Sequence, residues 1–250
     1  MEETYIFAGG TTAGSHYAAD YLNRIGLPVT DIPGGQARYI LLDVPSFGSD
    51  GYLRGGGRIE DLLTPLPKDI RVCGGNLNHP DLTEYDCVDF LKDETYLCEN
   101  AYITAECAID VALPYLQRTL RHCPTLIIGW GRIGKCLGQL LRNMGADVTI
   151  AARNIKDRAM IHALGYHTAD ISEIPQQLQH FRLLYNTVPY PILSAEQLAP
   201  YGDCIKIELA SKNGIEGEDV IIARGLPGLH MPESSGKLIA ETFIRLCYGR

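Results

Sequence analysis

Residues Pro124 to Asn154 read PTLIIGWGRIGKCLGQLLRNMGADVTIAARN. A short apolar run at 125–128 enters a G-x-G-x-x-G turn, which is followed by an amphipathic segment and a second β-rich run at 148–151. A strand, a glycine turn, a helix and a strand within about thirty residues is the spacing of a βαβ unit that binds a dinucleotide. The stretch therefore predicts such a site, and the alternative is a glycine-rich turn that binds nothing.

Each glycine of this turn has an expected part. Gly129 lets the chain turn sharply off the strand, Gly131 lets the backbone approach a pyrophosphate, and Gly134 lets the helix pack close to the sheet. The helix N-terminus then offers N–H groups and the positive end of a dipole to the phosphates. The predicted cofactor contacts in the turn are Gly129, Trp130, Gly131, Arg132, Ile133 and Gly134.

The end of the second run bears on the choice of cofactor. Units that bind NAD usually place an Asp or Glu there to bind the ribose 2′-hydroxyl, whereas this strand ends Ala151-Ala152-Arg153-Asn154. Arg153 can pair with a 2′-phosphate through its planar fork, and Asn154 can donate another hydrogen bond. The pattern favours NADP, with NAD possible; the alternative is that Arg153 is a solvated residue at a helix entry.

Composition limits the classes of function. The chain has 250 residues, of which 46% are apolar and 21% charged, which suits one large or two small globular domains. A net charge of -8 argues against nucleic acid or an acidic membrane as a partner, and no apolar run approaches a membrane span. The acidic N-terminus is unlike a signal peptide. Eight cysteines without a Cys-x-x-Cys pair and seven scattered histidines predict no metal or redox motif, and we expect a cytoplasmic chain with reduced thiols.

Strands and helices alternate along the whole chain, which predicts an α/β fold with parallel sheets. We expect two Rossmann-like, doubly wound domains in three α/β/α layers. Residues 1–98 form a Rossmann- or flavodoxin-like substrate domain, residues 99–232 bind NADP, and a closing helix at 233–250 packs back on the first domain. A long helix at 99–120, kinked or restarted at Pro114, is expected to join them.

Loops of small and polar residues follow several of the predicted strands. In a doubly wound sheet the ligand lies beyond the carboxyl ends of the strands, so these loops are expected around the cofactor and substrate. The loops add to the cofactor set Asn186, Thr187, Val188, Pro189, Ala210 and Ser211. A small dicarboxylate is expected in a cleft lined by Gly10, Thr11, Ser46, Arg54, Gly225 and Pro227. Each loop taken alone can be a plain turn, and 45–58 can equally be a disordered tip.

Two residues are candidates for acid–base work. His230 follows the 225–228 turn and titrates near neutral pH, and Glu106 lies on the predicted linking helix. The alternatives are a surface histidine and a solvated helix carboxylate. Arg54, Lys212 and Arg224 are candidates to bind a substrate carboxylate, although each taken alone can be a surface charge.

The motifs in this order resemble the A subunit of dipicolinate synthase. The residues that carry the resemblance are Thr104-Ala-Glu106, the 129–134 turn, and the segments at 151–154, 186–189, 209–211 and 225–228. The resemblance covers roughly residues 100–250. It implies an NADP-linked oxidation of 4-hydroxy-tetrahydrodipicolinate to dipicolinate, the spore metabolite made during sporulation, and a partner, the flavoprotein-like B subunit of that enzyme. It also places Thr104 and Glu106 at the substrate.

The sequence departs from this family at two places. Pro232-Glu233-Ser234-Ser235-Gly236 stands where the family tends to have Pro-Lys-Thr-Ala-Gly, and Lys212-Asn213-Gly214 stands where it has Pro-Gly-Gly. Both differences concern the substrate more than the cofactor. A D-2-hydroxy-acid dehydrogenase is a second reading, with Lys212 near its arginine and His230 near its histidine. A third is a sensor or scaffold that binds NADP without turnover. We also expect a homo-oligomer.

Overall fold

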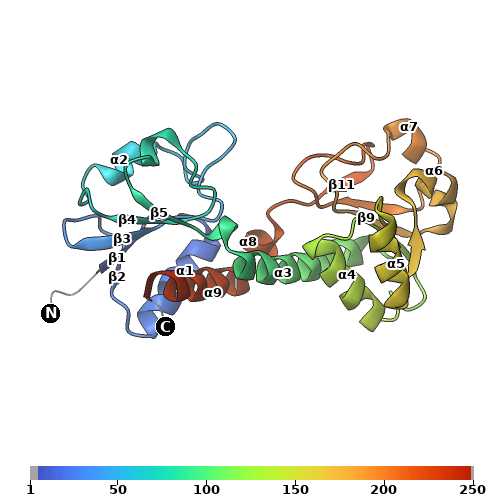
Figure 1. The fold of residues 1–250 in the computed structure, drawn as a ribbon, viewed down its shortest axis with the longest axis horizontal. Helices are drawn as coiled ribbons and strands as arrows, with labels where there is room; N and C mark the ends of the chain where they lie inside the picture. The colour runs from blue at the N-terminus through green and yellow to red at the C-terminus, as the bar shows by residue number, and fades with distance from the viewer. Residues whose placement is uncertain (1–4, 249–250) are drawn as a thin grey trace. The chain divides into compact units, whose positions relative to one another are not determined.

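The structure is a computed structural model that describes residues 5–248. The expectations for 1–4 and 249–250 lie outside these residues. The chain divides into two compact units, one of residues 1–100 with 227–250 and one of residues 101–226. Each unit holds one sheet, and all its strands are parallel (Figure 1). The predicted α/β class is confirmed.

The first unit has a five-stranded sheet in the order β2-β1-β3-β4-β5. Its strands are β1 (Tyr5–Ala8), β2 (Val29–Thr30), β3 (Ala37–Leu41), β4 (Arg71–Gly74) and β5 (Asp86–Asp89). Its helices are α1 (Ala13–Arg24), α2 (Ile59–Leu63), α8 (Leu226–His230) and α9 (Pro232–Phe243), with 3-10 turns at Pro80–Leu82 and Phe90–Lys92 and a π-helical turn at Ile244–Tyr248. This is the flavodoxin-like order, in which the direction of winding changes between β1 and β3.

Helices α1 and α9 pack side by side in this unit (Figure 1). Gly236 permits the close approach, because a Cβ there would lie 2.5 Å from the Gly14 carbonyl oxygen and 2.5 Å from Tyr17 Cβ. Past α9, the Arg245 guanidinium pairs with both oxygens of the Asp93 carboxylate at 2.5 and 3.0 Å. The C-terminal segment is therefore part of the first unit's packing.

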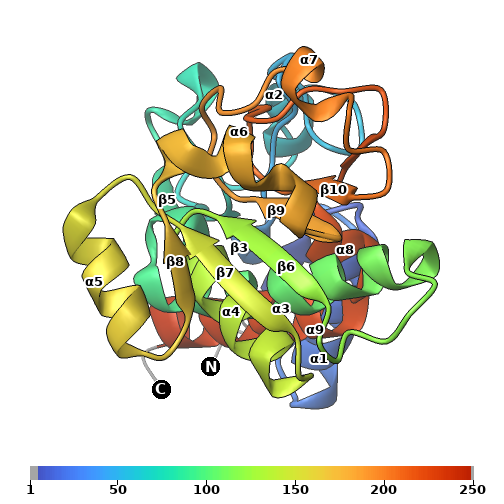
Figure 2. The same ribbon diagram turned by 90° about the vertical axis from the view of Figure 1, so that its right-hand side faces the viewer.

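The second unit has a six-stranded sheet in the order β11-β10-β9-β6-β7-β8 (Figure 2). Its strands are β6 (Pro124–Ile128), β7 (Asp147–Ala151), β8 (His167–Ala169), β9 (Leu183–Asn186), β10 (Ile205–Glu208) and β11 (Val220–Ile222). Its helices are α4 (Arg132–Asn143), α5 (Ile155–Ala163), α6 (Ile174–Gln177) and α7 (Ala195–Leu198), with 3-10 turns at Leu113–Tyr115, Ile171–Glu173 and Leu178–His180. Counted from β6, this is the 3-2-1-4-5-6 order of a Rossmann sheet.

Helix α3 (Glu94–Ala112) crosses the boundary between the two units. It starts earlier than the expected 99 and does not reach 120. A 3-10 turn containing Pro114 follows at Leu113–Tyr115, because proline has no N–H for the next helical hydrogen bond. Its buried residues in the second unit are mostly small, including Ala105, Ala108 and Ala112.

Candidate functional site

The candidate cofactor site lies at the switch point of the second unit. Strand β6 pairs with β7 on one side and β9 on the other, so Ile128 at its end is opposite both Ala151 and Asn186. A crevice forms beyond the strand ends where the winding changes direction in such a sheet. The glycine turn and the loops that follow β7, β9 and β10 all begin at this edge.

The glycine turn has the geometry expected from the sequence. Gly129 has a φ of +110°, and a Cβ there would lie 2.3 Å from Thr187 Oγ1. A Cβ at Gly134 would lie 2.3 Å from the Gly129 carbonyl oxygen, so only glycine lets α4 start this close to the turn. The tight turn at Gly129 and the close packing at Gly134 are therefore confirmed.

Gly131 differs from its two neighbours, because a Cβ there would meet no atom within 4 Å. It is the N-cap of α4, and it has no side chain with which to cap the helix. Open space in front of a helix N-terminus of this kind suits an external anion. Gly131 therefore has the space that a pyrophosphate needs.

The Trp130 side chain packs within the unit. Its ring centroid lies 6.1 Å from that of Tyr166 in an edge-on arrangement, and Lys135 Nζ lies 5.8 Å from the ring. Arg132 and Ile133 form the first turn of α4. Of the turn, the backbone more than the indole is placed to meet a ligand.

Glu208, which the sequence analysis missed, organises the loops after β9 and β10. Its side chain is fully buried, and it accepts hydrogen bonds from the backbone N–H groups of Ala210 (2.8 Å), Gly214 (2.7 Å) and Ile215 (3.0 Å). Asn186 Nδ2 donates to both carboxylate oxygens, at 3.0 and 2.9 Å. The charge is thus satisfied by four donors from two loops. The sequence signal was an acidic residue inside the apolar run 205–209.

The loop after β9 is held by its own polar groups. Asn186 also donates to the Val188 carbonyl at 2.9 Å and accepts from its N–H at 3.1 Å, and the Thr187 hydroxyl donates to the Ile128 carbonyl at 2.9 Å. These two side chains shape the loop, and Pro189 and Ser211 are exposed. Arg224 fixes the next loop by donating to the Ala210 carbonyl at 3.0 Å.

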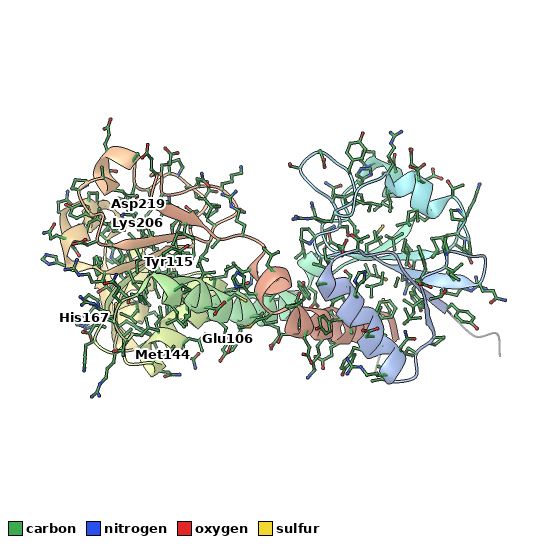
Figure 3. All side chains as sticks on the ribbon, turned by 180° about the vertical axis from the view of Figure 1, so that it is seen from behind. Glu106, Tyr115, Met144, His167, Lys206 and Asp219 are labelled. Carbon is green, nitrogen blue, oxygen red and sulfur yellow. The ribbon has the colours of Figure 1, made fainter. Side chains whose placement is uncertain are left out.

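Lys206 is a second buried charge on β10, at the opposite end of the strand. Its Nζ donates to the carbonyls of Tyr201 (2.8 Å) and Cys204 (3.0 Å) and pairs with Asp219 at 2.5 Å (Figure 3). All three partners precede β10 or β11 in the chain, at the edge away from the glycine turn. This ion pair supports the sheet and lies outside the candidate site.

The end of β7 presents Arg153 to solvent. Among residues 5–248, no hydrogen bond or ion pair engages its guanidinium, whereas Asn154 Oδ1 caps α5 by accepting from the Lys156 N–H at 2.9 Å. Arg158, another residue that sequence reasoning missed, donates to the Arg153 carbonyl at 2.8 Å and pairs with Asp170 at 2.7 Å. The backbone at Arg153 is thus fixed while its side chain stays available.

The four substrate candidates of the N-terminal sequence come together at the β1–β3 switch point of the first unit. Gly10 and Thr11 follow β1, and Ser46 and Arg54 belong to the segment after β3. The Arg54 N–H donates to the Ser46 carbonyl at 3.0 Å, and Gly55 lies so close to Thr11 that a Cβ would be 2.3 Å from Thr11 Oγ1. Arg54 itself is exposed.

A buried carboxylate, Asp43, occupies the N-terminus of α1 at this switch point. It accepts from the N–H groups of Thr11 (3.1 Å) and Thr12 (2.9 Å) and from the hydroxyls of Thr12 (2.7 Å) and Ser15 (2.5 Å). Burial alone would raise its pKa, but these hydrogen bonds outweigh burial and hold the pKa below its usual value. The Thr11 N–H is therefore already engaged by the protein itself.

Ser46 is also engaged, since its hydroxyl donates to the Asp43 carbonyl at 2.8 Å and accepts from the Gly75 N–H at 3.2 Å. The side chain is 1% exposed. Ser46 thus ties β3 to β4, and of the four candidates Arg54 has the most accessible side chain.

The remaining candidates are divided between the two units. Thr104 is buried on α3 and Glu106 is exposed on the same helix (Figure 3), whereas His230 is exposed at the end of α8. Gly225 has a φ of +65° and is exposed, and Pro227 is buried in α8. Glu106 and Thr104 thus belong to the second unit, and His230 and Pro227 to the first.

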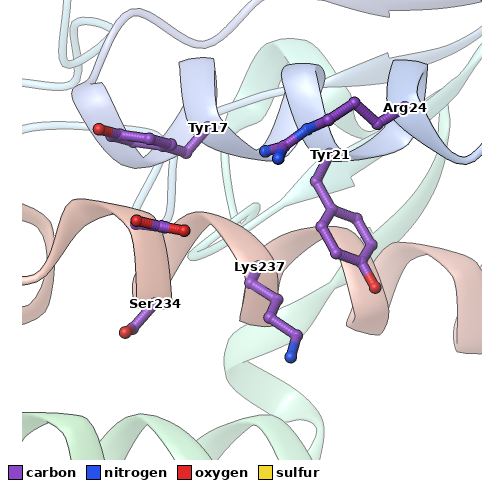
Figure 4. A pocket seen from close by; sticks show the side chains of 6 residues that line it. Tyr17, Tyr21, Arg24, Ser234 and Lys237 are labelled. Carbon is purple, nitrogen blue, oxygen red and sulfur yellow. The ribbon is translucent and has the colours of Figure 1, made fainter.

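A pocket of about 280 Å³ lies between α1 and α9 in the first unit (Figure 4). None of the predicted site residues lines it. Among residues 5–248, no group of three or more His, Cys, Asp or Glu side chains could hold a metal ion. Over the same residues, no helix combines the length and apolar character needed to cross a membrane.

Comparisons with known proteins agree with the resemblance seen in the sequence. The A subunit of dipicolinate synthase from Bacillus subtilis (strain 168) is 25% identical over 156 residues, which cover 59% of this chain and 52% of that protein. The crystal structure of the corresponding dipicolinate synthase subunit from Bacillus halodurans has a TM-score of 0.82 at 21% identity and covers 98% of each chain. The resemblance to the A subunit of dipicolinate synthase is confirmed.

The sequence match with the Bacillus subtilis protein spans about half of its length, so the likeness over the rest of the chain is one of fold. A transhydrogenase from Sinorhizobium meliloti has the same fold, with a TM-score of 0.70 at 13% identity, covering 96% of this chain and 92% of that one. No family model matches the chain. The dipicolinate synthase likeness therefore identifies the relatives, and the activity is a matter for proposal.

Proposed function

We propose that the chain is an NADP-dependent oxidoreductase that resembles the A subunit of dipicolinate synthase. The observation that carries the proposal is the open space at Gly131, in front of the α4 N-terminus and at the switch point of a Rossmann-ordered sheet. Every other feature of the turn is closed, since Gly129 and Gly134 contact neighbouring atoms. A turn that served packing alone would not need glycine at the open position.

In this proposal, the cofactor pyrophosphate lies on Gly131 and the first turn of α4. Arg153 pairs with the 2′-phosphate, which selects NADP, because no carboxylate stands at the end of β7 to repel that phosphate. The loops held by Glu208 and Asn186 lie beside the nicotinamide. When bound, NADP supplies the acceptor for a hydride.

The proposed substrate is the cyclic dicarboxylate 4-hydroxy-tetrahydrodipicolinate. Its conversion to dipicolinate removes one water and two hydrogens, of which NADP accepts a hydride and a proton is released. Glu106 and His230 are the candidates to move that proton, and Arg54, Gly225 and Pro227 to bind substrate. Support for this substrate comes from the names of the relatives, and the same names support a second, different polypeptide as partner.

Binding of NADP by Gly131→Ala protein tests the site. Because the new Cβ meets no atom within 4 Å and φ is -79°, the variant should unfold at the wild-type temperature while its NADP affinity falls at least about tenfold. Gly202→Ala is the matched control, since its Cβ is equally open and it precedes β10 at the other edge of the sheet. Equal NADP affinity in all three proteins would place the phosphates elsewhere.

The activity has a separate test. NADPH formation is measured with 4-hydroxy-tetrahydrodipicolinate, with and without a candidate for the flavoprotein-like partner, and a D-2-hydroxy acid serves as the alternative substrate. Formation of NADPH with the cyclic dicarboxylate supports the proposal, and formation with the hydroxy acid favours the second reading. NADP binding without turnover of either substrate would identify a sensor.

A further inference from the structure

Two cysteines that are 174 residues apart in the sequence meet in the first unit. Cys73 lies on β4 and Cys247 in the π-helical turn after α9, and their Sγ atoms are 3.5 Å apart. One thiol donates a hydrogen bond to the other. Both are free thiols, as are the other six cysteines.

The two thiols have different surroundings. Cys73 is fully buried, whereas Cys247 is half-buried and so is the one that a small reagent meets first. A row of polar side chains, Tyr39, Arg71 and Asp86, runs across β3, β4 and β5 beside them. This arrangement gives the pair one reachable sulfur and one protected sulfur.

Charge favours Cys247 as the nucleophile. The hydrogen bond from Cys73 lowers the pKa of Cys247 against the effect of burial, and the Arg71 guanidinium lowers it further. The same hydrogen bond and burial raise the pKa of Cys73, which keeps that thiol protonated. The thiolate therefore forms on the sulfur that solvent can reach.

We propose that Cys73 and Cys247 form a redox-active dithiol that hydroperoxides convert to a disulfide. The Cys247 thiolate attacks one peroxide oxygen, the O–O bond breaks, and the sulfenic acid forms with release of hydroxide or alkoxide, which takes up the proton. The Cys73 sulfur then attacks the sulfenic sulfur, and its proton leaves with the hydroxyl as water. Two thiols are oxidised by two electrons, and one peroxide is reduced.

The movement required is small. An S–S bond of about 2.05 Å needs the sulfurs to approach by about 1.5 Å. The product ties the turn after α9 to the middle of the first unit's sheet and encloses every residue of the second unit in one covalent loop. We expect the first unit's thermal midpoint to be higher in the oxidised protein by on the order of 5–10 °C.

The test treats the full chain with hydrogen peroxide, then blocks remaining thiols and maps the tryptic peptides by mass spectrometry. Since no lysine or arginine separates Cys73 from Cys87, one peptide carries both, and a Cys87→Ser background identifies the linked sulfur. The expected product is a Cys73–Cys247 peptide that dithiothreitol removes and that forms at a rate independent of protein concentration.

Single variants separate the two roles. Cys73→Ala should leave a Cys247 sulfenic acid that dimedone traps, and Cys247→Ser should abolish the reaction at both positions. Cys98→Ser, which removes an exposed thiol, should change nothing. The proposal is overturned if peroxide modifies Cys98 while Cys73 and Cys247 stay reduced, or if wild-type Cys247 is linked only to other chains.

Discussion

Replacing Glu208 by glutamine tests how the loops around the candidate cofactor site are held. The substitution keeps the shape of the side chain and exchanges one acceptor oxygen for an N–H₂ donor. If the amide oxygen stays with the N–H groups of Gly214 and Ile215, the new donor faces the Ala210 N–H and Asn186 Nδ2. No rotation of the amide satisfies both sides, because every partner is a donor.

The magnitude follows from the number of donors that lose their acceptor. A buried N–H group left unpaired costs about 1–3 kcal/mol, and a hydrogen bond to a charged group contributes about 1.5–3 kcal/mol. In the better orientation the Ala210 N–H loses its acceptor and Asn186 keeps only part of its bonding. We therefore expect the free energy of unfolding of the second unit to fall by roughly 2–4 kcal/mol.

Urea unfolding and calorimetry measure this loss, and NADP titration measures its effect on binding. The midpoint of the second unit should fall by roughly 5–15 °C. Glu216→Gln is the matched control, because that carboxylate is exposed one residue past Ile215 and should cost less than about 0.5 kcal/mol. A loss at Glu208 no larger than at Glu216 would refute the role assigned to the carboxylate.

Three further substitutions test other parts of the chain. Arg153→Ala should weaken NADP binding about ten- to a hundredfold and leave NAD binding nearly unchanged, because it removes a charge-assisted pair; equal loss by calorimetry would contradict this. Gly134→Ala should lower the second unit's unfolding free energy by roughly 1–3 kcal/mol in urea, since its Cβ would lie 2.3 Å from the Gly129 carbonyl oxygen. Asp43→Asn should reduce the pH dependence of stability: because the folded pKa is lowered, wild-type Asp43 stabilises above its unfolded pKa of about 3.9, and this contribution is lost as pH falls through the lower folded value. Acid titrations in which both proteins lose stability in parallel would count against that assignment.

The sequence by itself determined the βαβ unit at 124–154 and the parallel α/β class. Both depend on local chemistry: glycines set a turn, and apolar spacing sets a strand or a helix. The parts of Gly129 and Gly134 could be stated in advance, because their neighbours are a few residues away or are fixed by the βαβ geometry. The same local reasoning found that no acid stands at the end of β7.

Only the tertiary structure decided which polar groups are already satisfied. Asp43 lies 31 residues from Thr12 and Glu208 lies 22 residues from Asn186, so both contacts depend on strand order and register. Cys73 and Cys247 are still further apart, and no spacing rule joins them. Periodicity predicts the strands but leaves their neighbours open, because a residue's partner across a sheet is set by how the chain winds. The donors expected to meet a substrate at Thr11 and Ser46 are for this reason engaged by the fold itself.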